Sequence, residues 1–550
     1  MTLHARDLIS IPEETIRVAK AAFPKGNVYM TMRDQLKLWY KDSDFAPLFQ
    51  STQGLPAESP GRLALVTVMQ FAEGLTDAQA ADAVRGRLDW KYALGLELTD
   101  PGFHHSILSD YRQRLLAGGA ERQLLDDMLH QFRQQGLLKA RGQQRTDSTY
   151  VLATIRELNR LECIGETLRH ALNSLAVVVP AWLQAQVDPD WFDLYGPRFE
   201  QYRLPKTKQE RQALAERIGA DGYHLLTAVY DDTAPPWLRE VPAVETLRQV
   251  WIQHFMLDDG QVRWRQAANL PPAQRLIQSP YDVEARYSRK RQTTWTGYTA
   301  HPTETCDEKT PHLITNVETT AATTPDGQVT AAIHAHLAEK GLLPAEHIVD
   351  AGYIDADELV YSQTQHAIDL LGPVQADTSW QAQANQGFAA ACFAVDWETE
   401  VVTCPQGKLR RRWRPRQDSF DNEVIEVWFD QQDCGSCPTR LLCTRSKDRP
   451  RSLKLRPQAQ HVALQQARAY QETDEFKERY KKRAGIEGTI SQGTRSFDFR
   501  RARYVGLTKT HLQHVITAAA INPTRAVSWL QDRPRAQTRR SRFAVLAPAA

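Results

Sequence analysis

The sequence has few cysteines and no long hydrophobic run. Its 7 cysteines are spread over 550 residues, which does not make the disulfide framework of a secreted protein. The longest apolar stretch, residues 175–183, is interrupted by Pro180 and is far shorter than the roughly 20 residues that span a bilayer. Residues 1–20 contain no apolar run of signal-peptide length. We therefore expect a soluble, cytoplasmic protein with no membrane partner.

A net charge is also nearly absent. The 68 basic residues almost balance the 66 acidic ones, which leaves a formal charge of +2. Basic residues are nevertheless clustered at 408–416 (KLRRRWRPR), at 495–503 and in the tail at 533–542, and local patches of this kind suit an anionic partner such as nucleic acid. No glycine-rich loop of the G-x-x-x-x-G-K type occurs, so nothing indicates ATP dependence.

Hydrophobic periodicity predicts that the chain begins with helices. Apolar residues recur at three- and four-residue spacing in residues 1–140, as on the buried face of a helix. Thr76 is the predicted N-cap of a helix that follows a GLT turn. A short helix, a turn and a second helix are typical of a DNA-binding helix-turn-helix, and an ordinary helical bundle fits the same pattern.

Five short β-branched segments predict strands further along. A helix over 327–341, ending at Gly341, connects the third predicted strand to the fourth. Three strands, a crossover helix and two more strands describe an α/β sheet with helices on its faces. Residues 376–455 show no regular pattern, and 456–530 are helical again. The strands are expected at 143–153, 293–301, 312–320, 346–353 and 367–374.

Three acidic residues stand where a metal site would form. Asp147 lies in the first predicted strand and Asp350 ends the fourth, and active sites of parallel α/β sheets gather at the carboxyl ends of strands. Glu487 lies on a late basic helix, where Tyr480 and Arg483 share its face at offsets i, i+3 and i+7. Carboxylates suit Mg²⁺ or Mn²⁺, and two such ions promote in-line displacement at phosphorus. Turn or cap roles for the aspartates and a solvated ion pair for Glu487 are the structural alternatives.

The surroundings of these acids resemble a known family. TDST at 146–149, VDAGY at 349–353 and the Y-(2)-R-(3)-E spacing that ends at Glu487 are similar to the bacterial insertion-sequence transposases of the DDE superfamily, and more closely to the branch with a Tyr-Arg-Glu-Lys signature. The resemblance extends over about residues 30–530. It also rests on 282–301, on the pattern Phe103, Ser106, Leu108, Tyr111 and Arg112, and on 500–525 with Gly506, Leu507 and Asn522.

The resemblance implies an RNase H-like core with a mixed sheet, in which Asp147, Asp350 and Glu487 bind two Mg²⁺ or Mn²⁺ ions. It implies a DNA transposase that nicks the ends of its element and joins the freed 3′-hydroxyl to target DNA. The implied partners are the terminal inverted repeats and the target DNA, bound by a homodimer in the bacterial nucleoid. Tyr480 and Arg483 are expected to contact DNA near the cleaved end. The signature lysine should stand at position 494, where the sequence has Thr494, and Arg495 is its candidate replacement.

The resemblance also divides the chain. We expect a helical DNA-binding domain at 1–140, the first part of the core at 141–375 with a helical insertion at about 153–285, a Cys-, Arg- and Trp-rich insertion domain at 376–455, the rest of the core at 456–530 and a basic disordered tail at 531–550. Two other functions fit the same residues: a transposase-derived protein that binds DNA without catalysis, and an RNase H-like nuclease without strand transfer.

Four cysteines gather in the second insertion. Cys404, Cys434, Cys437 and Cys443 include the C-x-x-C knuckle CGSC, and four thiolates suit a tetrahedral structural Zn²⁺. Reduced or redox-active thiols without a metal are the alternative.

A basic run beside Cys404 contains Arg411, Arg412 and Trp413. Arginines pair with phosphate and tryptophans stack on bases, and Trp397 and Trp428 are further stacking candidates. A solvated edge strand with core tryptophans fits equally.

Overall fold

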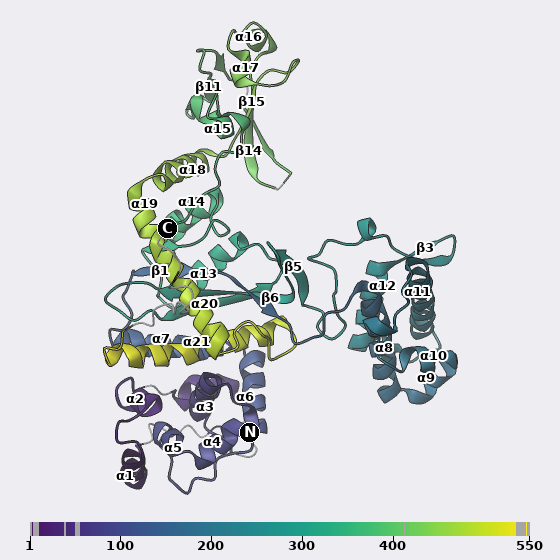
Figure 1. The fold of residues 1–550 in the computed structure, drawn as a ribbon, viewed down its shortest axis with the longest axis vertical. Helices are drawn as coiled ribbons and strands as arrows, with labels where there is room; N and C mark the ends of the chain where they lie inside the picture. Colours follow the sequence, from purple (N-terminus) through teal and green to yellow (C-terminus); the bar gives the residue numbers. More distant parts are fainter. Residues whose placement is uncertain are drawn as a thin grey trace.

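The computed structural model describes residues 3, 10–37, 40–49, 56–411, 413–419, 421–534 and 546. The N-terminal helices lie at one end of the long axis, the main sheet in the middle and a small β-rich part at the other end, while a helical insertion projects sideways (Figure 1). Among the described helices, none combines the length and apolar content that crossing a membrane requires.

The N-terminal part is helical, as the periodicity predicted. The Thr76 hydroxyl accepts a hydrogen bond from the backbone N–H of Gln79, and the Gln79 side chain accepts one from the backbone N–H of Thr76. Thr76 is therefore confirmed as an N-cap, in a capping box. The elements are α1 (Glu13–Ala22), α2 (Val28–Asp34), the 3₁₀ helix η1 (Asp42–Leu48), α3 (Pro60–Glu73), α4 (Asp77–Gly86), α5 (Leu88–Leu94), α6 (Ser106–Ala117) and α7 (Gln123–Gln134).

All five predicted strand segments form, and they build one mixed sheet. Its long central strand β6 pairs antiparallel with β7 on one side and with β1 and β2 on the other. β8 runs parallel to β1, and β9 runs parallel to β8, so the order across the sheet is β7, β6, β1, β8, β9. The strands are β1 (Gln143–Thr146), β2 (Thr149–Leu152), β5 (Arg286–Lys290), β6 (Thr293–Thr305), β7 (Ile314–Ala321), β8 (Glu346–Ile348) and β9 (Asp369–Leu371).

β1 and β2 are two parts of one strand. Thr146 lies opposite Thr303 and Thr149 opposite Ala300 on the same partner strand. Asp147 and Ser148, between β1 and β2, interrupt the strand pairing with β6 but remain within the sheet.

Helices cover the sheet and carry the chain across it. α13 (Gly327–Glu339) connects β7 to β8 as predicted, and Gly341, with φ +63°, lies just beyond its end in the left-handed conformation that glycine favours. After β9, the helical run predicted for 456–530 consists of α18 (Gln458–Gln471), α19 (Asp474–Tyr480), the 3₁₀ turn η6 (Lys481–Ala484), α20 (Gly485–Ser496) and α21 (Leu507–Leu530), and α14 (Ala356–His366) lies between β8 and β9.

The N-terminal helices and the sheet share one apolar core. Trp90 and Leu108 from the helices belong to the same buried cluster as Val317 of β7 and Ile516 of α21. α21 packs against α3 and α7 as well as against β7, and Figure 1 shows it between the N-terminal helices and the sheet.

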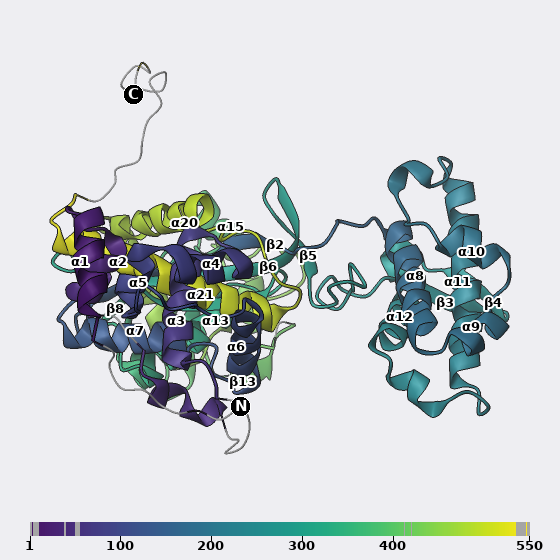
Figure 2. The same ribbon diagram turned by 90° about the horizontal axis from the view of Figure 1, so that it is seen from below.

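The helical insertion between β2 and β5 has a core of its own. Its buried cluster includes Leu168, Ile218 and Trp251, and Figure 2 shows this part standing apart from the body on two connecting segments. Leu152 at the end of β2 and Arg286 at the start of β5 both lie opposite Gly297 of β6. The insertion contains α8 (Arg160–Val178), α9 (Pro180–Gln186), α10 (Asp190–Tyr195), η2 (Gln201–Arg203), α11 (Lys208–Tyr230), η3 (Pro236–Glu240), α12 (Pro242–His254), β3 (Phe255–Asp258), β4 (Gln261–Trp264) and η4 (Ala267–Asn269).

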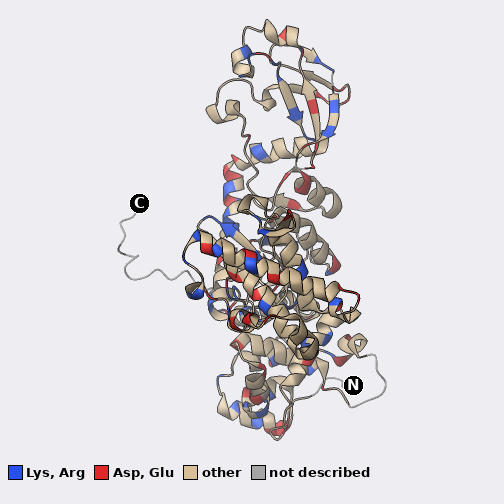
Figure 3. Ribbon diagram, turned by 90° about the vertical axis from the view of Figure 1, so that its right-hand side faces the viewer, with Lys and Arg blue, Asp and Glu red and all other residues tan. Residues whose placement is uncertain are grey.

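The part at 376–455 contains two small antiparallel sheets, although its sequence shows no period. Most of its strands have only two to five residues, too few for alternation to be visible. Figure 3 shows Lys and Arg positions along these strands. The elements are α15 (Trp380–Ala384), η5 (Ala390–Cys392), β10 (Ala394–Asp396), β11 (Val401–Thr403), β12 (Leu409–Arg410), β13 (Trp413–Gln417), β14 (Glu423–Trp428), α16 (Gln431–Gly435), α17 (Arg440–Cys443) and β15 (Ser452–Leu455).

Candidate active site

Asp147 occupies the break between β1 and β2. It is 8% exposed, and its Oδ1 accepts a hydrogen bond from the backbone N–H of Ser148 at 2.8 Å. Burial raises the pKa of the Asp147 carboxyl above its usual value, and the nearby Arg483 guanidinium opposes this rise. A buried carboxylate on a strand therefore depends on a cation supplied by another part of the chain.

Asp350 stands beside Asp147 because two parallel strands are in register. Arg145 of β1 lies opposite Ile348 of β8, and each aspartate follows two residues later on its own chain. Neighbouring strands lie about 4.8 Å apart, so the two carboxylates emerge side by side at the carboxyl edge of the sheet. Asp350 Oδ1 also accepts a hydrogen bond from the backbone N–H of Gly352 at 2.8 Å. Asp350 therefore has the turn role that was the structural alternative, and it also lies beside Asp147.

Glu487 lies in the first turn of α20. The sequence predicted Tyr480, Arg483 and Glu487 on one face of a single helix. Instead, Tyr480 ends α19, Arg483 lies in the 3₁₀ turn η6 and Glu487 follows in α20. The tighter turn keeps Arg483 next to Glu487, because Arg483 Nη1 lies 3.4 Å from Glu487 Oε1.

The η6 turn is fastened to β1. The Arg145 guanidinium donates a hydrogen bond to the backbone carbonyl of Lys482, and Lys482 Nζ donates one to Gln143 Oε1 at 2.7 Å. In the next turn Thr489 donates to the fully buried Glu304 of β6. These contacts position the Glu487 helix on the strand that carries Asp147.

The Arg483 guanidinium joins all three predicted acids. Its Nη2 lies 2.7 Å from Asp147 Oδ2 and 3.7 Å from Asp350 Oδ2, and its Nη1 contacts Glu487. The acids therefore face one cleft, with a volume of about 510 Å³. Among the described residues, no three acidic, histidine or cysteine side chains are arranged to hold a metal ion. Their ligand chemistry suits Mg²⁺ or Mn²⁺, and a bound ion would take the place of Arg483.

The cleft contains a fourth acid that the sequence analysis missed. Asp326 directly precedes α13, and its Oδ2 accepts a hydrogen bond from the Ser148 hydroxyl at 3.2 Å. Lys290 Nζ lies 3.7 Å from the same oxygen. Burial raises the pKa of Asp326, and Lys290 opposes this rise. Its only signal in the sequence is its position directly before the crossover helix, which starts near the edge where Asp147 and Asp350 emerge.

Several predicted DNA contacts lie away from these acids. Arg495 is exposed on α20 and is not among the residues that line the cleft. Arg411 and Trp413 belong to the small β-rich part, where the Trp413 ring meets Trp397 edge to face at 5.4 Å. Trp397 and Trp413 pack against the core of that part, which agrees with the core alternative for them. Arg412 lies outside the described residues, as does most of the predicted tail.

The four clustered cysteines line one cavity of about 200 Å³ in the small β-rich part. All are free thiols. Burial raises the pKa of the Cys443 thiol, and the nearby Cys434, Cys404 and Cys437 thiols add to this effect. The thiols are thus gathered, but in the described structure they do not stand at the positions of a metal-binding group.

Two transposase family models match parts of the chain. Residues 403–527, which include Glu487, match the model of a transposase DDE domain, and residues 17–114 match the model of a transposase domain, DUF772. No curated protein and no solved structure matches the chain. Both family models are those of transposases, in agreement with the resemblance of the acidic motifs. These two matches support a bacterial insertion-sequence transposase of the DDE type.

Proposed function

We propose that the protein is a DNA transposase that cleaves the ends of its insertion sequence and transfers them to target DNA, with Asp147, Asp350 and Glu487 as the catalytic carboxylates. The observation that carries this proposal is the contact of one guanidinium, that of Arg483, with all three acids in one cleft. These residues come from two neighbouring strands and a helix that lie far apart in the sequence, yet they converge at the carboxyl edge of the sheet, where active sites of α/β folds form.

We propose an RNase H-like core for the catalytic part. The order of the strands supports this assignment. Three antiparallel strands lie in the order β7, β6, β1, and two strands parallel to β1 follow. Within such a core the first acid belongs to the first strand, the second to the fourth strand and the third to a later helix, which is how Asp147, Asp350 and Glu487 are distributed.

The three acids would hold two Mg²⁺ or Mn²⁺ ions. When bound, these ions lower the pKa of the attacking water or 3′-hydroxyl and stabilise the leaving oxygen. Arg483 keeps the acids together until then, because a cation offsets the mutual repulsion of three carboxylates. Once displaced, its planar guanidinium is free to pair with a phosphate of the bound strand.

The N-terminal helices and the small β-rich part would bind and organise DNA. The α3–α4 pair, joined through Gly74 at φ +68° and capped by Thr76, supports a helix-turn-helix role for the N-terminal helices. The small β-rich part, with its clustered cysteines, would be a zinc-stiffened insertion. Two element ends must be brought together, so we propose a homodimer on DNA in the bacterial cytoplasm.

Purified protein, Mg²⁺ and labelled duplexes that carry the element ends test the proposal. Nicks at the ends together with joined products support a transposase. Nicks without joining favour an RNase H-like nuclease, and binding without cleavage favours a transposase-derived DNA-binding protein.

A further inference from the structure

The cleft with the three acids has a second wall that is basic. Its lining includes Arg289, Lys290 and Arg291 together with Arg500. Three of these four cations belong to one structure, the hairpin formed by β5 and the first residues of β6. A site that presents only carboxylates repels a phosphodiester, so a second, cationic surface is needed to hold the strand being cut.

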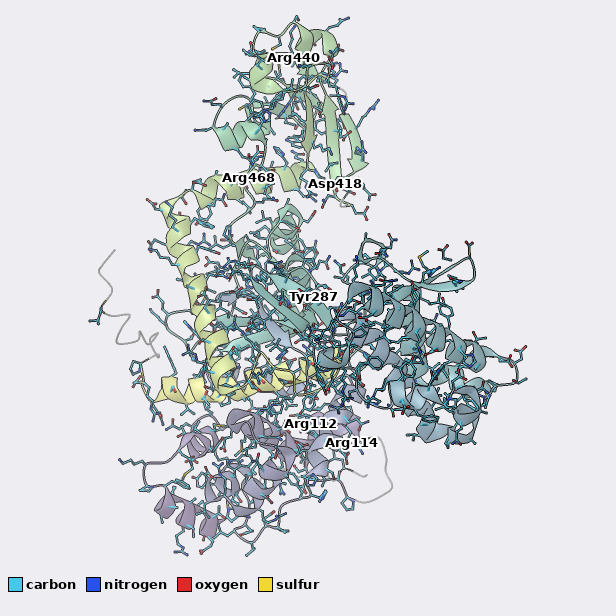
Figure 4. The ribbon with its side chains drawn as sticks, turned by 45° about the vertical axis from the view of Figure 1, so that its right-hand side comes forward. Arg112, Arg114, Tyr287, Asp418, Arg440 and Arg468 are labelled. Carbon is cyan, nitrogen blue, oxygen red and sulfur yellow. The ribbon has the colours of Figure 1, made fainter. Side chains whose placement is uncertain are left out.

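The hairpin extends beyond the sheet. β5 pairs with residues 293–297 of β6, and the pairing of β6 with β2 begins only at Gly297. The two strands are joined at Arg291, which has φ +57°, a conformation that glycine, asparagine and aspartate adopt more readily than arginine. A cation thus occupies a turn position where smaller residues are favoured. Figure 4 places Tyr287 of this hairpin at the edge of the sheet, towards the helical insertion.

Lys290 reaches from the hairpin to the acids. Its Nζ donates a hydrogen bond to the Ser148 hydroxyl at 3.3 Å, next to Asp147 in the chain, and it lies 3.7 Å from Asp326. The side chain remains 59% exposed. Arg289 Nε donates to the backbone carbonyl of Arg291, and within the described part of the chain neither arginine forms an ion pair with a carboxylate. These cations are therefore available to an anion that enters the cleft.

We infer that the β5–β6 hairpin binds the phosphate backbone of the DNA strand beside the reacting phosphate, with Lys290 as the contact nearest to the acids and Arg289 and Arg291 as further contacts. The inference rests on the proposed function for the position of the DNA, but it concerns binding and not chemistry. Asp326 holds Lys290 in the DNA-free protein, and phosphate replaces it when the strand is bound.

Binding in EDTA tests the inference without any cleavage. The probes are a duplex with the element-end sequence and a duplex of scrambled sequence, titrated at several KCl concentrations. Each phosphate contact that is lost lowers the slope of log K against log salt by about 0.9. We expect Lys290→Ala to lower the salt slope by about one on both probes and to weaken DNA binding several-fold. Lys290→Arg should keep the wild-type slope and affinity. Adding Arg289→Ala and Arg291→Ala should lower the slope further.

Arg263→Ala is the matched control. Arg263 also lies on a β-hairpin and also faces one carboxylate, Glu216 at 3.6 Å, but its hairpin belongs to the helical insertion. Its removal should leave the slope unchanged. Melting temperatures establish that each variant is folded. An unchanged slope for folded Lys290→Ala would overturn the inference and leave the lysine as a structural partner of Asp326.

Asp326→Asn distinguishes a DNA-binding role of Lys290 from a purely structural one, even if Lys290→Ala fails to fold. A purely structural pair predicts that both partners have the same effect on DNA affinity. The inference predicts the opposite sign, since removal of Asp326 frees Lys290 for phosphate and should tighten binding. Weaker binding by Asp326→Asn would contradict it.

A neutral methylphosphonate at single positions around the cleavage point locates the contact. At the phosphate that Lys290 contacts, Lys290→Ala should cause no further loss of affinity. If no position near the cleavage point abolishes the effect of the variant, the inference fails. A different outcome is that DNA binding depends on Lys290 while the wild-type protein never cleaves DNA in Mg²⁺. That outcome would refute the proposed function but leave the hairpin contact with DNA standing.

Discussion

Arg483 donates a hydrogen bond to Asp147 at 2.7 Å across 336 positions of the sequence. The same guanidinium contacts Asp350 and Glu487, so one cation links both strand acids with the helix acid. If the three acids bind divalent ions as we propose, Arg483 and such an ion would compete for the same carboxylates.

Removal of Arg483 should tighten metal binding. In Arg483→Ala the acids lose their internal cation, and we expect Mn²⁺ to bind the DNA-free protein at least about tenfold more tightly, since a hydrogen bond between charged groups contributes about 1.5–3 kcal/mol. Calorimetric titration with Mn²⁺ measures this. Arg495→Ala removes an exposed cation from the same helical run and should have no effect. Weaker metal binding by Arg483→Ala would show that the guanidinium supports the metal site instead of competing with it.

Substitution of any acid should abolish cleavage and spare DNA binding. Asp147→Asn, Asp350→Asn and Glu487→Gln each remove a metal ligand with little change in volume. We expect losses above roughly 100-fold, because even residues that only support ligands cost 10–100-fold. Cleavage of end-labelled duplexes and binding in EDTA measure the two properties.

The control for these variants is Glu478→Gln. Glu478 is exposed and pairs with Lys481, shortly before Glu487 on the same helical run. It should retain wild-type cleavage. Near wild-type cleavage by one of the three acid variants would remove that residue from the metal site.

The cysteine cluster predicts bound zinc. Protein purified without added metal should contain about one zinc per chain if Cys404, Cys434, Cys437 and Cys443 form a tetrahedral site. Cys437→Ser should lose the metal and destabilise the part at 376–455, because metal binding contributes directly to the folding of such units. Cys392→Ser, at an exposed cysteine of the same part, should retain it. A wild-type stoichiometry near zero would leave reduced thiols as the explanation.

Buried histidines should make the fold sensitive to acid. Burial lowers the pKa of His301 and His514 to about 3 and that of His334 and His511 to about 4. Below the ordinary value of 6.5, the unfolded chain binds protons that the folded chain excludes, so stability is full above about pH 6.5 and falls as the pH drops towards 4. Each such histidine contributes about 1.4 kcal/mol per pH unit in this window.

Thermal melts between pH 7.5 and 4.5 (about the range over which these groups titrate) check this expectation. His514→Gln should lessen the pH dependence by about one proton. Asp127 and Glu358, with pKa values raised by burial to about 6 and about 7, act in the opposite sense, so the net slope reports the excess of histidines. A melting temperature that does not fall below pH 6.5 would contradict the prediction.

Glu304 should be essential for stability and for the position of Glu487. It is fully buried and pairs with Arg145 of β1 and Arg525 of α21. Glu304→Gln leaves buried Arg145 and half-buried Arg525 without a counter-charge and should cost about 3–5 kcal/mol in the free energy of unfolding. Urea unfolding measures this cost. Glu14→Gln breaks an exposed pair with Arg17 and should cost much less, because water screens an exposed ion pair.

Much of the sheet was readable from the sequence because its strands are β-branched and bounded by turns. Asp147 and Asp350 could be proposed as neighbours, since parallel strands end at one edge. Asp326 could not, because an aspartate before a helix usually serves as a cap, and only the fold brings it to Ser148 and Lys290. The hairpin of Lys290 was equally hidden, since β5 is polar and exposed and lacks the alternation of a half-buried strand.

The helical insertion is attached at a single spot on the sheet. Leu152 and Arg286 flank the same residue, Gly297, from opposite sides, so they are about 10 Å apart. A linker of about four residues covers that distance. Because the insertion has a core of its own, it should be replaceable or removable without a change in the order of the strands of the main sheet. Changes of length within the insertion should therefore be tolerated, whereas a one-residue insertion or deletion between Thr146 and Asp147 would shift Asp147 out of register with Asp350.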